Sequence, residues 1–133
     1  MVIYNTDYIK ILYHEQHKMV ETVWLGFAGS KDYRAALDQY IDVLQTHEVR
    51  RWLGDQRQAR VVRPVDQQWT VRTWAPVFVT LIGGIKKMAR VKSKDVAALI
   101  SSDNMRHDID FSKLPLEFRD FEDYDKAKAW LLE

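Results

Sequence analysis

The sequence predicts an α/β fold: a mixed sheet of four to five strands, about four helices, and an N-terminal antiparallel hairpin. Short runs rich in β-branched and aromatic residues alternate along the chain with longer runs whose apolar residues recur every three to four positions. Single helices between strands imply right-handed crossovers, which produce a mostly parallel sheet. The 133 residues, 47% of them hydrophobic, fit one domain spanning residues 1–133.

The first third of the chain predicts the hairpin and then a helix. Residues 8–13 and 20–27 have strand composition and flank the polar segment 14–18, which indicates two antiparallel strands. Ser30 is a good N-cap, and apolar residues follow it at helical spacing. These residues are Tyr33, Ala36, Leu37, Tyr40, Ile41 and Leu44. The segment therefore predicts an amphipathic helix with one buried face.

The middle of the chain predicts a short strand and an interrupted helix. The stretch "RRWLGD" is typical of a short buried strand, and it ends at Asp55. Pro64 and the N-cap candidate Asp66 open a second helical region. Because Pro76 removes a helical hydrogen bond, we expect a kink or a restart there, with the glycines at 83–84 ending the region.

The last third predicts two more strands and two more helices. They are a strand at 85–92, a short helix at 94–102, a polar loop at 101–112, a strand at 117–121 and a final helix. Asp123 is the expected N-cap of that final helix, which turns Ala127, Trp130 and Leu131 toward the core.

Composition excludes several classes of protein. Cysteine is absent, so no disulfide framework and no thiolate nucleophile exists. The first ten residues lack the basic and apolar regions of a signal peptide, and residues 75–85, the most apolar stretch, are far shorter than the roughly 20 residues of a membrane helix. We therefore expect a soluble, cytoplasmic protein with no membrane span.

The charge is distributed unevenly. Residues 50–94 contain eleven Lys or Arg against two aspartates, a net charge of +9 in a chain whose total is +1. A basic middle between acidic ends either meets an anionic ligand or is neutralised within the fold or across a homodimer. Neutralisation is the favoured interpretation, because nucleic-acid-binding domains usually keep a clear basic excess and no helix-turn-helix, RNP or KH pattern is present.

The pattern resembles the STAS and SpoIIAA-like domains, and in particular bacterial STAS-like proteins in which an aspartate and a tryptophan open the second helix. The resemblance covers nearly the whole chain. It depends on short motifs: "LGDQR", "DQQW", Trp74 with Pro76 two residues later, "GGIKKMARV", and the ending Phe121, Asp123, Ala127, Trp130 and Leu131. It implies a small sheet covered largely on one face by helices.

The resemblance also implies a function from which this sequence departs. The best-known relatives are anti-sigma factor antagonists, which are switched by phosphorylation of a serine after the third strand. Between His47 and Trp69 this chain has no Ser, Thr or Tyr, so that switch cannot operate here. Related SpoIIAA-like domains resemble lipid-binding folds, and binding of an apolar ligand therefore stays open.

Motifs for other chemistry are missing. His14 and His17 lie near the hairpin turn, where their spacing does not aim both rings at one metal ion. His107 lies in an Asp-rich segment without the glycine and glutamate of a calcium loop. No nucleophile elbow, phosphate-binding loop or dinucleotide fingerprint is present. We expect no metal and no cofactor.

The residues with the strongest claim to a site surround the second helix. Trp69 and Trp74 lie in or beside the basic segment, where a tryptophan-lined cleft with arginine at its mouth would suit an amphipathic anion such as a fatty acid or a lipid head group. Asp55, Arg57 and Asp66 supply the polar groups, and Arg57 beside Trp69 is the predicted centre. The alternative for the tryptophans is ordinary core packing.

Two functions remain. The first is a non-catalytic regulatory or interaction module that binds a protein partner, itself as a homodimer, or an apolar anion. The second is a small enzyme that uses the same cleft. A catalytic cleft should hold a carboxylate or histidine with a shifted pKa facing an open pocket, whereas an interaction module should show an apolar surface and a filled core.

Overall fold

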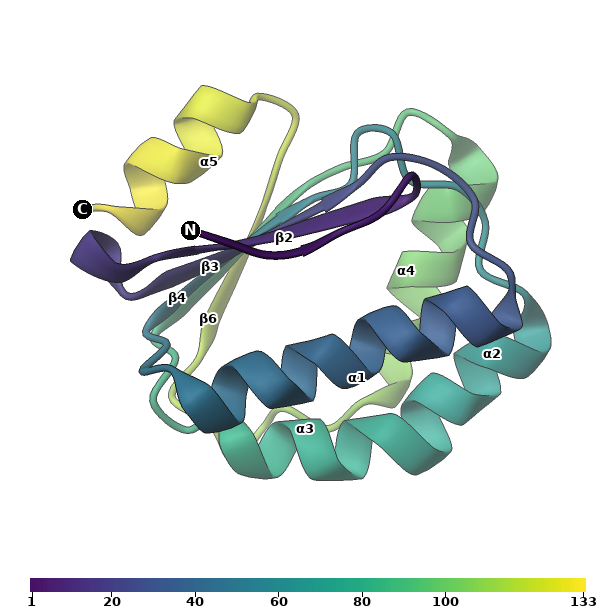
Figure 1. Ribbon diagram of the computed structural model, residues 1–133, viewed down its shortest axis with the longest axis horizontal. Helices are drawn as coiled ribbons and strands as arrows, with labels where there is room; N and C mark the ends of the chain where they lie inside the picture. Colours follow the sequence, from purple (N-terminus) through teal and green to yellow (C-terminus); the bar gives the residue numbers. More distant parts are fainter.

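The computed structural model describes residues 1–133 and shows a mixed α/β fold with a six-stranded sheet (Figure 1). The strands are β1 (Val2–Asn5), β2 (Ile9–His14), β3 (Met19–Trp24), β4 (Arg51–Asp55), β5 (Lys87–Val91) and β6 (Glu117–Phe121). The helices are α1 (Ser30–Thr46), α2 (Pro64–Trp69), α3 (Ala75–Leu81), α4 (Val96–Asp108) and α5 (Tyr124–Leu131). A short 3-10 turn, η1 (Glu15–His17), closes the β2–β3 hairpin, and a π-helical turn, η2 (Thr70–Trp74), joins α2 to α3.

The order of the strands across the sheet is the same as their order along the chain. The pairs β1–β2 and β2–β3 are antiparallel, and β3 to β6 are parallel. From β3 onward, each crossover adds the next parallel strand at the same edge of the sheet. Because such crossovers are right-handed, the helices that connect these strands all lie on one face. Figure 1 shows α1, α3 and α4 together on that face and α5 alone on the other.

Alternation along the strands divides the core into two parts. On the helical face, Ile9, Ile11 and Val20 of β2 and β3 pack with α1, η2 and α3 in a cluster of 15 buried residues. On the opposite face, Leu53 and Val91 belong to a cluster of 7 that α5 completes. The second core is small, and α5 is the only helix that covers it.

The sheet has more strands than the sequence predicted. The hairpin, the parallel strands and the mixed topology are as expected, but the sheet has six strands rather than four or five. The additional strand is β1, whose four residues pair with β2 across an irregular register between Val2 and Tyr4. A run this short carries too little periodicity to be recognised from sequence.

Two helix starts differ from expectation. Gly29 is the N-cap of α1. Ser30 is the first helical residue, and its hydroxyl donates a hydrogen bond to the Asp66 carboxylate at 2.8 Å. Asp66 does not cap α2, which begins after Arg63; it is a buried residue of the first turn. Asp123 is confirmed as the N-cap of α5, where it accepts from the amide of Lys126 at 2.9 Å.

Two further segments show how tertiary packing overrides local composition. The segment expected as a polar loop at 101–112 is helical as far as Asp108, because α4 continues through it. The break expected at Pro76 occurs as the π-turn η2 directly before it, and the chain continues helically to the turn at 83–84. No helix is both long and apolar enough to cross a bilayer.

Candidate functional site

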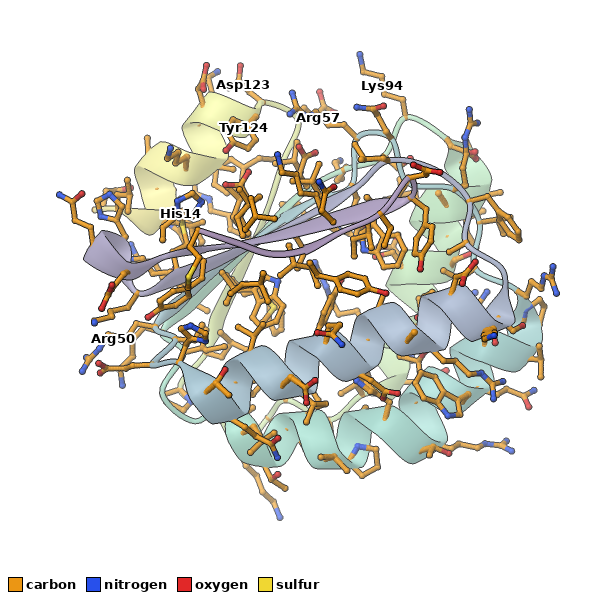
Figure 2. The ribbon with its side chains drawn as sticks, viewed as in Figure 1. His14, Arg50, Arg57, Lys94, Asp123 and Tyr124 are labelled. Carbon is orange, nitrogen blue, oxygen red and sulfur yellow. The ribbon has the colours of Figure 1, made fainter.

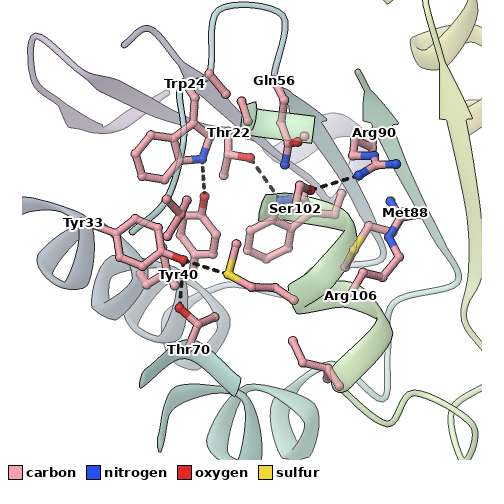
Figure 3. Close-up of a pocket in the computed structure, with 18 of the residues that line it drawn as sticks. Thr22, Trp24, Tyr33, Tyr40, Gln56, Thr70, Met88, Arg90, Ser102 and Arg106 are labelled. Atoms are coloured by element: carbon pink, nitrogen blue, oxygen red, sulfur yellow. Dashed lines mark hydrogen bonds between the residues drawn. The ribbon is translucent and has the colours of Figure 1, made fainter. Parts of the chain in front are cut away.

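A cavity of about 210 Å³ lies between the helical face of the sheet and helices α1, α3 and α4 (Figure 3). Of its 27 lining residues, 18 are hydrophobic, so it is an apolar space. Its volume lies between the roughly 150 Å³ that accepts benzene and the roughly 300 Å³ at which drug-sized pockets begin. It therefore fits a small aromatic or short acyl ligand.

Interlocking aromatic rings form one wall of the cavity. Trp74 stacks on Phe78 with ring centroids 4.4 Å apart, and Trp52 meets Phe78 edge to face at 5.8 Å. Tyr40 lies between the two tryptophans, 5.1 Å from Trp52 and 5.9 Å from Trp74. The indole nitrogen of Trp74 donates to the carbonyl oxygen of Leu37 at 2.8 Å, which fixes the ring. This aromatic wall is formed without a ligand.

A few polar groups are spaced around the apolar wall. The Tyr33 hydroxyl lies 2.8 Å from the Thr70 hydroxyl and donates toward the sulfur of Met105 at 3.4 Å. On the strand side, the indole nitrogen of Trp24 donates to the Tyr40 hydroxyl at 3.1 Å. Figure 3 shows both tyrosines facing the interior of the cavity. A few polar groups at fixed positions in an apolar wall give a ligand its orientation.

Both tyrosines are neutral at physiological pH, and burial moves the pKa of each further from it. Burial raises the pKa of Tyr40 to about 12, and hydrogen bonds involving Trp24 and Thr22 offset only part of the effect. Burial likewise raises the pKa of Tyr33. None of the lining residues is Asp, Glu, His or Cys. The cavity therefore offers hydrogen-bond donors but no carboxylate, imidazole or thiolate to act as a general base, so its serine and threonine hydroxyls have no activating group among the lining residues.

Three arginines border the cavity. Arg90 is buried and held by Asp120 at 2.8 Å and Asp103 at 2.7 Å. Burial opposes its charged form, yet these hydrogen bonds leave the pKa of Arg90 raised. Arg106 shares Asp120 at 3.1 Å, and Arg60 is the most exposed of the three, with only a 3.2 Å contact to Asp95. Arg60 is therefore the cation most available to an anionic ligand.

The structure separates the five predicted site residues into three environments. Trp74 is buried and lines the cavity, as does Trp52. Asp66 is 1% exposed and ties α2 to α1 by accepting from Ser30 and from Arg34, whose Nε lies 3.1 Å away. It is a structural bridge rather than a ligand group.

Trp69 lies outside the cavity lining. Its ring meets Tyr33 edge to face at 6.4 Å and carries the guanidinium of Arg34 at 5.1 Å. The expectation that Arg57 would lie beside Trp69 is wrong. Arg34 occupies that position instead. It belongs to α1 and is part of none of the motifs singled out in the sequence.

Asp55 and Arg57 lie on the face of the sheet that α5 covers. Arg57 donates to both carboxylate oxygens of Asp55, at 3.0 and 2.8 Å, and its guanidinium lies 5.0 Å from the centre of the Tyr124 ring. Figure 2 shows Arg57 and Tyr124 together beside α5. The two predicted polar residues are thus brought together, but they do not face the cavity.

A second group of polar side chains lies beside this pair. The Tyr124 hydroxyl donates to Glu21 at 2.7 Å, and His14 contacts the other oxygen of Glu21 at 2.9 Å. Burial, followed by the hydrogen bond to Glu21, raises the pKa of Tyr124. His14 therefore ends a strand and contacts a buried carboxylate, whereas the sequence placed it only near the hairpin turn. No group of three or more His, Cys, Asp or Glu side chains is arranged to hold a metal ion.

Sequence reasoning missed most of the cavity wall. Tyr33, Tyr40 and Leu37 were identified as core positions of a helix, and nothing in their spacing distinguishes a residue that faces a cavity from one that is fully packed. Met105 and Arg106 had no signal, because the helix before them was expected to end at residue 102, and Arg90 was expected only as part of the strand at 85–92.

Comparisons with protein-family models, with curated proteins and with solved structures found no match to this chain. Function must therefore be argued from the cavity and the surface around it.

Proposed function

We propose that this protein is a non-catalytic binding module of STAS-like type whose cavity holds a small, largely apolar ligand with an acidic or hydrogen-bonding end. The observation that carries the proposal is the apolar cavity of about 210 Å³ between the sheet and its helices. Well-packed cores leave few voids larger than a water molecule, so a space of this size in a core of this kind supports a binding role.

The chemistry of the wall supports the ligand class. Aromatic rings of Trp52, Trp74 and Phe78 provide flat apolar contacts, and the neutral hydroxyls of Tyr33 and Tyr40 provide polar contacts. Arg60 is the exposed cation among the lining residues and suits a carboxylate at the opening.

The same wall argues against an enzyme at this site. The cavity is open and apolar, but no carboxylate or histidine faces it. Of the three buried carboxylates, Glu21 and Asp55 lie on the other face, each bonded to a protein partner. Asp66 lies outside the cavity lining and is bonded to Ser30 and Arg34. The structure matches neither expectation in full. The core contains a cavity, unlike the filled core expected of an interaction module, but no carboxylate or histidine lines it, unlike the cleft expected of an enzyme.

Titration with octanoate and with 1-octanol tests the proposal. Trp24, Trp52 and Trp74 line the cavity, so an occupied cavity should change the intrinsic fluorescence in a saturable way. We expect both compounds to bind, octanoate more tightly through Arg60, and acetate to have no effect because it lacks the apolar chain. No saturable change with either long compound would contradict the proposal.

Native mass spectrometry of the protein purified from its own host provides a second test. Spectra recorded before and after organic extraction separate a co-purifying ligand, a homodimer and a bare monomer. A small molecule that is present before extraction and lost after it would support the proposal. If all of the protein were homodimeric and carried no small molecule, the result would favour the protein-interaction alternative.

A further inference from the structure

One edge of the sheet combines exposed apolar side chains with basic ones. The loops 25–29, 56–63 and 92–95 follow the carboxyl ends of β3, β4 and β5, which are parallel and therefore end at the same edge. We call these loops, with Val65 and Val96 at the helix starts that follow them, the carboxyl-edge patch.

Contacts between the loops hold the patch together. The guanidinium of Arg63 lies 5.4 Å from the centre of the Phe27 ring, which joins the first loop to the second. The Ser93 hydroxyl donates to the carbonyl oxygen of Ala59 at 3.1 Å, which joins the second loop to the third. The three loops are therefore one continuous surface.

Apolar residues are concentrated on this surface. Six of the nine exposed large hydrophobic side chains belong to the patch or to the second turn of α4 beside it. They are Leu25, Phe27, Val61, Val65, Val96 and Ile100. Single exposed apolar residues are normal on a protein surface, but a concentration on one edge indicates an interaction site.

The charge of the patch identifies the partner. Its loops carry five Lys or Arg against one acidic residue, Asp95, although the whole chain is nearly neutral. Lys94 projects from this edge in Figure 2. The loops contain none of the Trp or Tyr that protein interfaces favour, and valine and leucine add no hydrogen bond to a phosphate or a base edge of nucleic acid. Aliphatic side chains interleaved with cations match the acyl chains and the charge of an anionic bilayer.

We propose that the carboxyl-edge patch docks this protein peripherally on membranes that contain anionic lipid. Leu25, Phe27 and Val65 enter the headgroup region while Arg63 and Lys94 contact lipid phosphates. The same loops supply Gly26, Ala59 and Val61 to the cavity wall, so docking places the cavity against the bilayer. The docking inference does not require the proposed cavity ligand, because it concerns only the outer surface of the loops.

Co-sedimentation of the full chain with vesicles tests the inference. The vesicles contain phosphatidylcholine alone or phosphatidylcholine with phosphatidylglycerol. We expect binding only to the second kind, with affinity that decreases as salt is added. Equal binding to both kinds, or binding to neither, would overturn the proposal. Tighter binding to duplex DNA than to the anionic vesicles would also overturn it and would assign the patch to nucleic acid.

Matched variants separate the patch from general effects of charge. Lys94→Glu and Lys126→Glu make the same change at exposed lysines beside helix starts, but only Lys94 belongs to the patch. We expect Lys94→Glu to weaken vesicle binding roughly 25-fold, at about fivefold for each of the two units of charge that change. Lys126→Glu should have little effect. An equal loss in both variants would contradict docking through this edge.

A second matched pair tests apolar insertion. Val65 is 56% exposed in the first turn of α2, and Val77 is 48% exposed in the first turn of α3, outside the patch. We expect Val65→Asp to weaken binding tenfold or more even at high salt and Val77→Asp to leave it unchanged. Circular dichroism confirms folding of each variant, and the lysine pair keeps the test decisive if an aspartate variant unfolds.

Discussion

Gly54 provides a direct test of whether the cavity is retained for function. This glycine lies on β4 and lines the cavity. A β-carbon placed on it would lie 3.6 Å from the Ala89 carbonyl oxygen and 3.8 Å from the Thr22 hydroxyl, both ordinary contacts. The variant Gly54→Val therefore fits the backbone and extends two methyl groups into the cavity.

The expected effect on stability is a small gain. Three added carbons at about 0.8 kcal/mol each contribute about 2.4 kcal/mol, and removal of a glycine from a strand adds about 0.5–1 kcal/mol. Crowding of a packed wall subtracts about 1–3 kcal/mol. The net result is about 1 kcal/mol in favour of folding, which should raise Tm by roughly 3–5 °C.

The assay combines thermal unfolding with the octanoate titration. Gly54→Val should keep or raise Tm and lose most octanoate binding. Gly84→Val is the control, because a β-carbon there also lies 3.6 Å from a carbonyl oxygen, that of Val49, but outside the cavity. Unchanged octanoate binding in a folded Gly54→Val variant would refute the cavity as the binding site. A drop in Tm of several degrees would refute the idea that the space is empty.

Two further predictions concern stability. Tyr124→Phe removes the hydroxyl bonded to Glu21 and leaves that buried carboxylate with one partner fewer, so urea denaturation should show a loss of about 1–3 kcal/mol. For Asp120, burial opposes the charged form, but the hydrogen bond from Arg90 and the charge of Arg106 hold the pKa of Asp120 below its usual value. Its contribution is therefore present above about pH 4 and lost as the pH falls through the depressed pKa, so Asp120→Asn should unfold with a shallower dependence on acid below pH 4. An unchanged acid profile in Asp120→Asn, or full stability in Tyr124→Phe, would contradict these assignments.

The main elements of the fold could be predicted because their patterns are local. The helical spacing from Tyr33 onward, the cap at Asp123 and the strand composition of β4 each lie within one segment. β1 was missed because four residues carry almost no pattern, and α4 was shortened because Ser, Asp and Asn favour turns when read alone.

The candidate site was harder to predict because it depends on distant pairings. Arg57 meets Tyr124, which lies 67 positions later in the chain, and its own neighbour Asp55 faces away from the cavity. Trp74 was identified as a site candidate, and it does line the cavity. The spacing of residues along the chain does not reveal a cavity, because a cavity forms where side chains from several elements fail to fill the space between them.

The matching order of strands in the chain and in the sheet also affects how the protein can be assembled during synthesis. Each strand from β2 to β6 emerges next to an edge that is already formed, so the sheet can grow without waiting for a later segment. The exception is α5, which packs back across β4 and β5 and covers Met19, Leu53 and Val91. Until α5 is made, those side chains stay exposed to chaperones and to other nascent chains. A chain released after residue 123 should therefore have a complete helical layer and an unprotected second face.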